Sequence, residues 1–141
     1  MIFLASGSAE STEQPVGVSD DSNETQKKFI EIILWSYLDT VSRSDANILE
    51  KFNNLKLSWQ KETKHVGFIA EIALHPAYQE IIGMGKPVIP MILRDLQKEP
   101  HHWFWALSSI TGDNPIKPEQ KGIMREMINS WLEWGKEKGY I

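Results

Sequence analysis

The stretch GMGKPVIPMILRDLQKEPHHWFWALSSITG, residues 83–112, decides the fold of this chain. Gly83 and Gly85 can end one helix with a positive φ, and Pro87 suits the first turn of the next helix. Pro90 lies close enough to that start to bend the helix rather than break it. The stretch therefore predicts two helices joined by a short turn, which form a helical hairpin.

Both helices of this hairpin carry apolar residues at helical spacing. At 100° per residue, Trp103, Leu107 and Ile110 share one face of the second helix, and we expect that face to pack on the first helix. Trp105 then points to the opposite side, beside His101, and Phe104 lies at the boundary. The terminal helix can cover Trp105 with its own tryptophans, or Trp105 can stay exposed as an anchor for a partner; the first alternative is favoured.

Further helices are expected on the N-terminal side of the hairpin. Asn23 can cap a first helix that runs to about residue 42, and Asp45 can cap a second that runs to about Lys64. Short helical segments follow over residues 68–74 and 77–82, on either side of Pro76.

The first of these helices is unusually apolar. Its apolar residues cover more than half of the helix circumference, wider than the stripe that a surface helix needs. They are Phe29, Ile30, Ile32, Ile33, Leu34, Tyr37, Leu38 and Val41. The helix must therefore be buried on two sides, either centrally in the fold or between the domain and a partner or second copy. Central burial is favoured.

The C-terminal end completes an all-α prediction. Pro118 and Glu119 can open a last helix whose apolar face includes Trp131 and Trp134. No strand pattern is present. We expect a compact bundle of five to seven helices that forms a single domain over residues 23–141, after a disordered acidic tail at residues 1–22.

Composition narrows the class of protein. The chain has 141 residues, six tryptophans and no cysteine, which excludes disulfides and thiolate metal sites and favours a cytoplasmic location. It contains no run long enough for a signal peptide or a membrane span. Residues 1–26 carry a formal charge of −5 and the remainder +1, so no basic surface is predicted and a nucleic-acid role stays open without support.

The sequence offers no catalytic pattern. The four histidines do not have the spacing of a metal site, and His101 and His102 fit a solvated first turn. The carboxylates occur where helix surfaces need charge, and the serines lack the context of a nucleophile. We therefore expect no enzymatic activity, no cofactor and no metal.

Residues 83–112, with their Gly-x-Pro entry, early proline and terminal ITG, resemble one unit of a HEAT-type helical repeat. A wider stretch, about residues 49–140, is similar to a widespread family of small uncharacterised bacterial proteins. These resemblances imply a helical hairpin within a bundle and a bacterial source.

The favoured interpretation is a non-enzymatic module for protein–protein interaction, an accessory or neutralising subunit of a bacterial multi-protein system. Its partner is another protein or a second copy, bound through apolar helix surface. The candidate partner-binding residues are His101, Phe104, Trp105, Trp134, Trp35 and Tyr37. The alternative is a nucleic-acid-associated accessory protein that uses aromatic stacking and scattered lysines.

Overall fold

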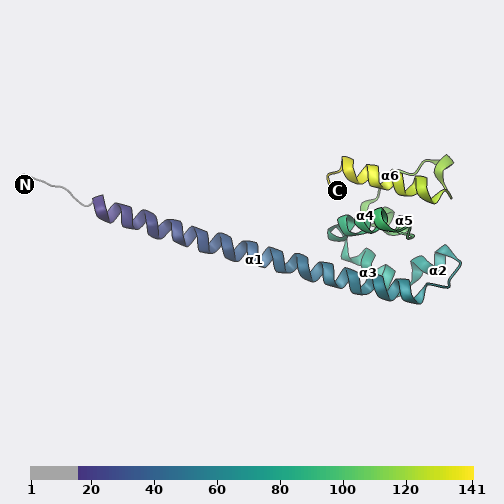
Figure 1. Cartoon of the computed structure of the whole chain (residues 1–141), viewed down its shortest axis with the longest axis horizontal. Coiled ribbons are helices and arrows are strands. Elements are labelled where there is room, and N and C mark those ends of the chain that lie inside the picture. Colours follow the sequence, from purple (N-terminus) through teal and green to yellow (C-terminus); the bar gives the residue numbers. More distant parts are fainter. Residues whose placement is uncertain (1–15) are drawn as a thin grey trace, which may run out of the picture. The chain divides into compact units, whose positions relative to one another are not determined.

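The computed structural model describes the backbone of residues 16–141 and the side chains of residues 22–141. Over residues 16–141 the chain forms six α-helices and no strand, which confirms the predicted all-α class and number of helices (Figure 1). The helices are α1 (Val16–Glu62), α2 (Ile69–Leu74), α3 (Pro76–Met84), α4 (Ile89–Lys98), α5 (Phe104–Thr111) and α6 (Met124–Glu137). Single 3₁₀ turns precede α4 and α6, at Lys86–Val88 and Pro118–Gln120.

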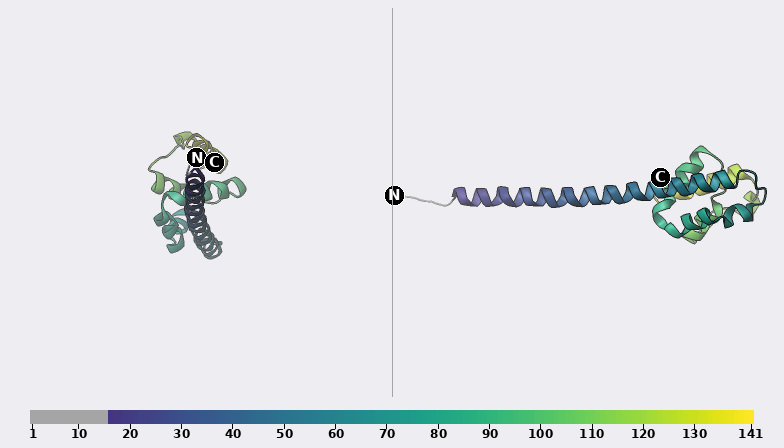
Figure 2. Two further views of the ribbon diagram at one scale, coloured as in Figure 1. Left: turned by 90° about the vertical axis from the view of Figure 1, so that its left-hand side faces the viewer. Right: turned by 90° about the horizontal axis from the view of Figure 1, so that it is seen from below.

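A single helix, α1, replaces the two that the sequence predicted on either side of Asp45. Figure 2 shows it as one continuous ribbon. The predicted boundary was wrong because Ser and Asp, although they suit a helix cap, are also tolerated inside a helix when no Gly or Pro accompanies them. Arg43 pairs with Asp39 one turn earlier, which supports the helix across this region.

The start of α1 also differs from the prediction. The helix begins at Val16, ahead of the expected cap at Asn23. Residues 1–15 of the predicted acidic tail lie outside the described residues. By its contacts the chain divides into one unit up to Ser44 and another over Asp45–Ile141. This division falls inside the single domain predicted over 23–141.

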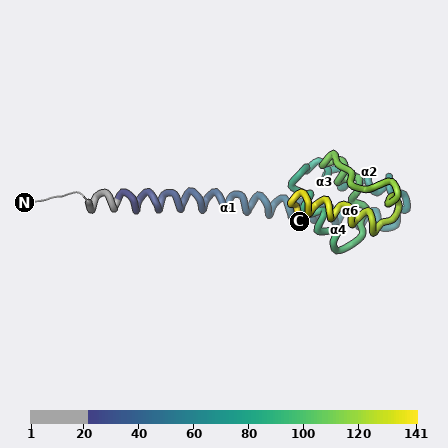
Figure 3. Tube along the Cα trace, turned by 90° about the horizontal axis from the view of Figure 1, so that it is seen from above, coloured from purple at the N-terminus to yellow at the C-terminus, as the bar shows by residue number. Residues whose placement is uncertain are grey.

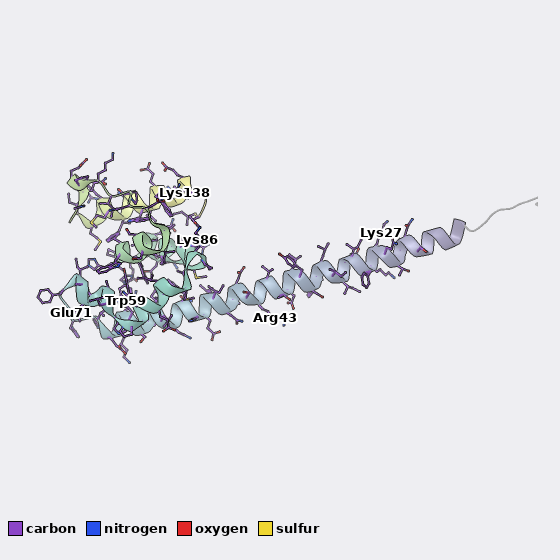
Figure 4. The ribbon with its side chains drawn as sticks, turned by 180° about the vertical axis from the view of Figure 1, so that it is seen from behind. Lys27, Arg43, Trp59, Glu71, Lys86 and Lys138 are labelled. Atoms are coloured by element: carbon purple, nitrogen blue, oxygen red, sulfur yellow. The ribbon has the colours of Figure 1, made fainter. Side chains whose placement is uncertain are left out.

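Three layers of helix make up the unit over residues 45–141. α4 and α5 lie between α6 on one side and α3 with the last turns of α1 on the other (Figure 1). α6 runs beside α4 (Figure 3). Trp59 of α1 points into this unit, where its ring packs on Tyr78 and Trp103 (Figure 4). Four tryptophans, Trp59, Trp103, Trp131 and Trp134, are buried in its core.

The hairpin of residues 83–112 forms as two packed helices, α4 and α5. Gly85 has a φ of 78° and Gly112 a φ of 75°, so both glycines end helices with a positive φ, as the sequence predicted for Gly85. The same prediction for Gly83 was wrong, because Gly83 lies inside α3. Trp103 and Leu107 are buried, and Ile110 is half-buried. The Trp103 ring packs on Phe52 and Trp59 of α1 and stacks on Tyr78 of α3, so this face does not pack on α4 alone as expected.

Two helix starts were predicted too early. α5 begins at Phe104, so His101 and His102 lie in the preceding turn rather than on the helix. α6 begins at Met124 rather than at Pro118, because Gly122, at a φ of 87°, separates the short 3₁₀ turn from the helix.

Candidate interaction surfaces

The most exposed apolar surface is the part of α1 over residues 29–41, called here the α1 apolar segment. Its nine large apolar side chains are each between 40% and 73% exposed. The expectation of central burial was therefore wrong. The apolar pattern showed that the helix needs to be covered, but a pattern does not say whether the cover comes from the same chain.

Trp35 and Tyr37, both proposed for partner binding, belong to the α1 apolar segment. The Trp35 side chain is 73% exposed, the largest exposed fraction in the segment, and Tyr37 is 65% exposed. Among residues 22–44 every side chain is exposed except Asp39, which is half-exposed and paired with Arg43. Figure 4 shows Lys27 and Arg43 projecting from this stretch.

A second apolar surface lies on the unit over residues 45–141. It is a groove of about 260 Å³ between α2, α5 and α6. Trp105 lines this groove and is 48% exposed, and the side chains of Phe104 and His102 lie beside it. The other lining residues are Ile69, Ala73, Gly122, Met124 and Met127. Trp105 thus points away from the hairpin core, as helix geometry predicted.

The tryptophans of α6 do not cover Trp105 in the way that was expected. Trp131 and Trp134 pack edge to face with ring centroids 5.1 Å apart, and Trp134 stacks on Tyr140. The Trp134 indole N–H donates to Asp113 Oδ2 at 3.0 Å. Since Trp134 is buried, it is unavailable as an exposed anchor, which corrects its inclusion among the partner-binding residues.

A polar cluster around Asp95 is the main feature that sequence reasoning missed. The Asp95 carboxylate is buried between α1, α4 and the turn before α5. Its Oδ1 accepts from Lys56 Nζ at 2.9 Å, and its Oδ2 accepts from the Trp103 indole at 2.6 Å and from His101 Nδ1 at 2.7 Å. Burial by itself raises the Asp95 pKa, but these hydrogen bonds outweigh burial and lower the pKa to about 2.

His101 belongs to this cluster rather than to a solvated turn, which corrects the sequence interpretation. Its Nε2 lies 3.2 Å from Glu99 Oε1, and the Gln60 side-chain nitrogen lies 3.1 Å from its Nδ1. His101 therefore fastens the turn before α5 to α1 and α4. Its neighbour His102 faces the apolar groove. The His102 pKa is lowered, mainly by burial and to a smaller extent by the charge of the nearby His101.

Tyr78 fixes the same turn from the other side. Its hydroxyl donates to the His102 carbonyl at 2.8 Å and accepts from the Ala106 N–H at 3.0 Å. Burial raises the pKa of this phenol above its ordinary value, so the group remains neutral. The polar groups near the histidines thus hold backbone in place. Over the described residues, no group of three His, Asp or Glu side chains is placed to hold a metal ion.

The comparisons with known proteins add no relative: no family model, no curated protein and no solved structure matches this chain. The resemblance of residues 83–112 to a HEAT-type unit and that of residues 49–140 to a bacterial family therefore stay predictions. Over residues 16–141, no helix combines the length and apolarity needed to cross a membrane.

The Asp95 cluster left only a faint signal in the sequence. A lone aspartate on the inward face of a helix, three residues from buried Ile92 and one from buried Leu96, indicates a buried carboxylate that needs donors. The donors could not be identified, because Lys56 is 39 residues away along the chain, and because His101 and Trp103 lie in a turn that the sequence pattern assigned to a helix.

Proposed function

We propose that this protein is a non-enzymatic helical module that binds protein chains through the α1 apolar segment. In this proposal it serves as an accessory or neutralising subunit of a bacterial multi-protein system. The observation that carries the proposal is the exposure of nine large apolar side chains within thirteen consecutive residues of one helix.

The energetics support a binding role for this segment. Covering one large apolar side chain contributes about 1.5–3 kcal/mol, so covering even half of this set offsets several kcal/mol of association entropy. A helix that is apolar on most of its circumference is stable in proteins when other elements surround it. Aromatic side chains such as Trp35 and Tyr37 are also typical anchors of protein interfaces.

In this proposal the two units of the chain have different roles. The unit over residues 45–141 has its own core with buried aromatic side chains, so we expect it to fold without the α1 apolar segment. The segment supplies the contact surface. The groove beside Trp105 is a smaller apolar surface, and its half-exposed tryptophan suits a secondary contact.

A photo-crosslinking experiment tests the proposal. A photoreactive amino acid replaces Tyr37 in the full chain, and crosslinking is done in an extract of the source cells at low salt and at about 1 M salt. We expect a protein adduct that persists at high salt, because apolar contacts are not screened. A second substitution, Leu34→Glu, should abolish the adduct, whereas Ser36→Glu, on the half of the helix that carries Glu31 and Asp39, should leave it.

Two results would contradict the proposal. The first is the absence of any protein adduct at residue 37. The second is an adduct with nucleic acid that disappears at high salt, which would favour the nucleic-acid alternative.

A further inference from the structure

The apolar side chains of the α1 apolar segment are not spread evenly around the helix. At 100° per residue, one half of the circumference carries seven of the nine, and the other half carries Glu31 and Asp39 together with Ile32 and Trp35. The seven are Phe29, Ile30, Ile33, Leu34, Tyr37, Leu38 and Val41. We call this half of the α1 apolar segment the broad face.

The spacing on the broad face is that of a helix-packing seam. Ile30, Leu34, Tyr37 and Val41 follow one another at intervals of four, three and four residues, as the a and d positions of a heptad do. The same intervals recur later in α1, at Ile48, Phe52, Leu55 and Trp59. That second stripe packs into the helical core of the unit over residues 45–141, with Phe52 and Trp59 each 2% exposed. A stripe of this kind is thus covered by helices.

The width of the broad face indicates how many helices cover it. Ile33 and Leu38 occupy the g and e positions beside the seam, where two-stranded coiled coils usually carry charges. Apolar residues at e and g let each helix pack against two neighbours. Ile30 at d with Leu34 at a also favours three or four helices over two.

A second copy of the chain can supply the helices that cover the broad face, and no charged residues need to pair across the interface. Asp39 pairs with Arg43 on the same helix, so these charges need no partner across an interface, and they lie on the half opposite the broad face. The broad face offers on the order of 700 Å² per copy at roughly 100 Å² of exposed surface per side chain, close to the ~800 Å² per partner of a stable complex.

From these observations we infer that the chain self-associates, and that the broad faces of two or more copies pack together to form a helical bundle. This inference rests on the proposed function and names the partner of the α1 apolar segment as a second copy.

Light scattering coupled to size-exclusion chromatography tests the inference on the full chain. From about 1 to 100 μM, a range in which micromolar assemblies form, we expect a mass of two to four times the 16.2 kDa of one chain. The double variant Leu34→Glu/Val41→Glu should reduce the mass to that of one chain. The matched control, Ser36→Glu/Ser42→Glu, adds the same charge to the other half of the helix and should keep the assembled mass.

Near-ultraviolet circular dichroism of each variant tests whether the core tryptophans keep their packing, and we expect an unchanged spectrum. A wild-type protein that stays monomeric at about 100 μM overturns the inference, and so does a Leu34→Glu/Val41→Glu variant that keeps its assembled mass. The proposed function fails separately: a monomeric chain that crosslinks from residue 37 to a different protein contradicts only the second-copy inference, whereas a monomeric chain with no protein adduct at residue 37 contradicts both.

Discussion

Among the residues whose side chains are described, Asp95 is the charged residue that is buried. Its hydrogen bonds make the free energy of unfolding depend on pH. Its pKa of about 2 in the folded chain is below the ordinary value of 3.8, so folding favours the ionised form. The resulting stabilisation is complete above about pH 4 and is lost as the pH falls toward 2. It amounts to roughly 2 kcal/mol.

We expect the free energy of unfolding to fall by about this amount between pH 5 and 2, beyond the loss shown by an Asp95→Asn variant. Urea unfolding at several pH values measures both slopes. Glu80→Gln is the control, because Glu80 pairs with Lys51 at 3.7 Å on the surface. This substitution should leave the dependence of the unfolding free energy on pH as it is in the wild type. Identical slopes in Asp95→Asn and wild type would show that the carboxylate is not stabilised.

Two buried tryptophans should respond differently to the same substitution. The Trp103 indole N–H donates to Asp95, whereas the Trp131 indole N–H is buried without an acceptor. Trp103→Phe therefore loses volume and a charge-assisted hydrogen bond, while Trp131→Phe loses volume but also removes an unsatisfied donor. We expect Trp103→Phe to be more destabilising by about 1–3 kcal/mol in urea unfolding. Equal losses would indicate that the Trp131 N–H is satisfied in solution.

At the scale of elements, Gly135 allows α6 to approach α4. A Cβ at this position would lie 2.6 Å from Leu93 Cδ1, and Leu93 is fully buried. We expect Gly135→Ala to destabilise the fold by about 1–3 kcal/mol, because the core must shift to accept the methyl group. Thermal unfolding measures the effect.

Second substitutions separate this clash from other effects of alanine. Leu93→Val should recover part of the loss in the Gly135→Ala background, since it shortens the side chain that the new Cβ meets. Gly83→Ala, in a helix with open space around the position, should be neutral or stabilising by up to about 1 kcal/mol. Fully additive losses in the double variant would argue against the contact.

Local chemistry predicted part of the fold, and distant contacts account for what it missed. The positive φ of Gly85 and the burial of Trp103 were predicted correctly, because both follow from the residues nearby in the sequence. Asp45 was read as a helix cap because the residues around it suit a cap and a helix interior alike. The Asp95 cluster depends on Lys56 and His101, whose approach is created only by the packing of α1 on α4 and the turn before α5.

At the scale of the whole molecule, the two units should separate in function. A chain that begins at Asp45 keeps every residue of the core, so we expect it to unfold at a temperature within a few degrees of the full chain. It should also run as a monomer, since it lacks the α1 apolar segment. Calorimetry and light scattering measure the two properties.

Removal of residues 1–22 alone is the matched control for this truncation, and it should leave the assembled mass unchanged. Had the α1 apolar segment been central to the fold, removal of residues 1–44 would unfold the protein. An unfolded product would therefore contradict the division into two units.

The tryptophans differ in exposure, so their fluorescence reports on different parts of the chain. Trp35 is the only one of the six tryptophans that precedes residue 45, and it is largely exposed, whereas Trp59, Trp103, Trp131 and Trp134 are buried. Emission of the folded protein should therefore contain a quencher-accessible fraction from Trp35 and Trp105 and a protected fraction from the core. A partner that covers Trp35, which lies outside the broad face, would shift its emission toward shorter wavelength while the core signal stays constant, so a single unlabelled sample can report that contact and folding separately.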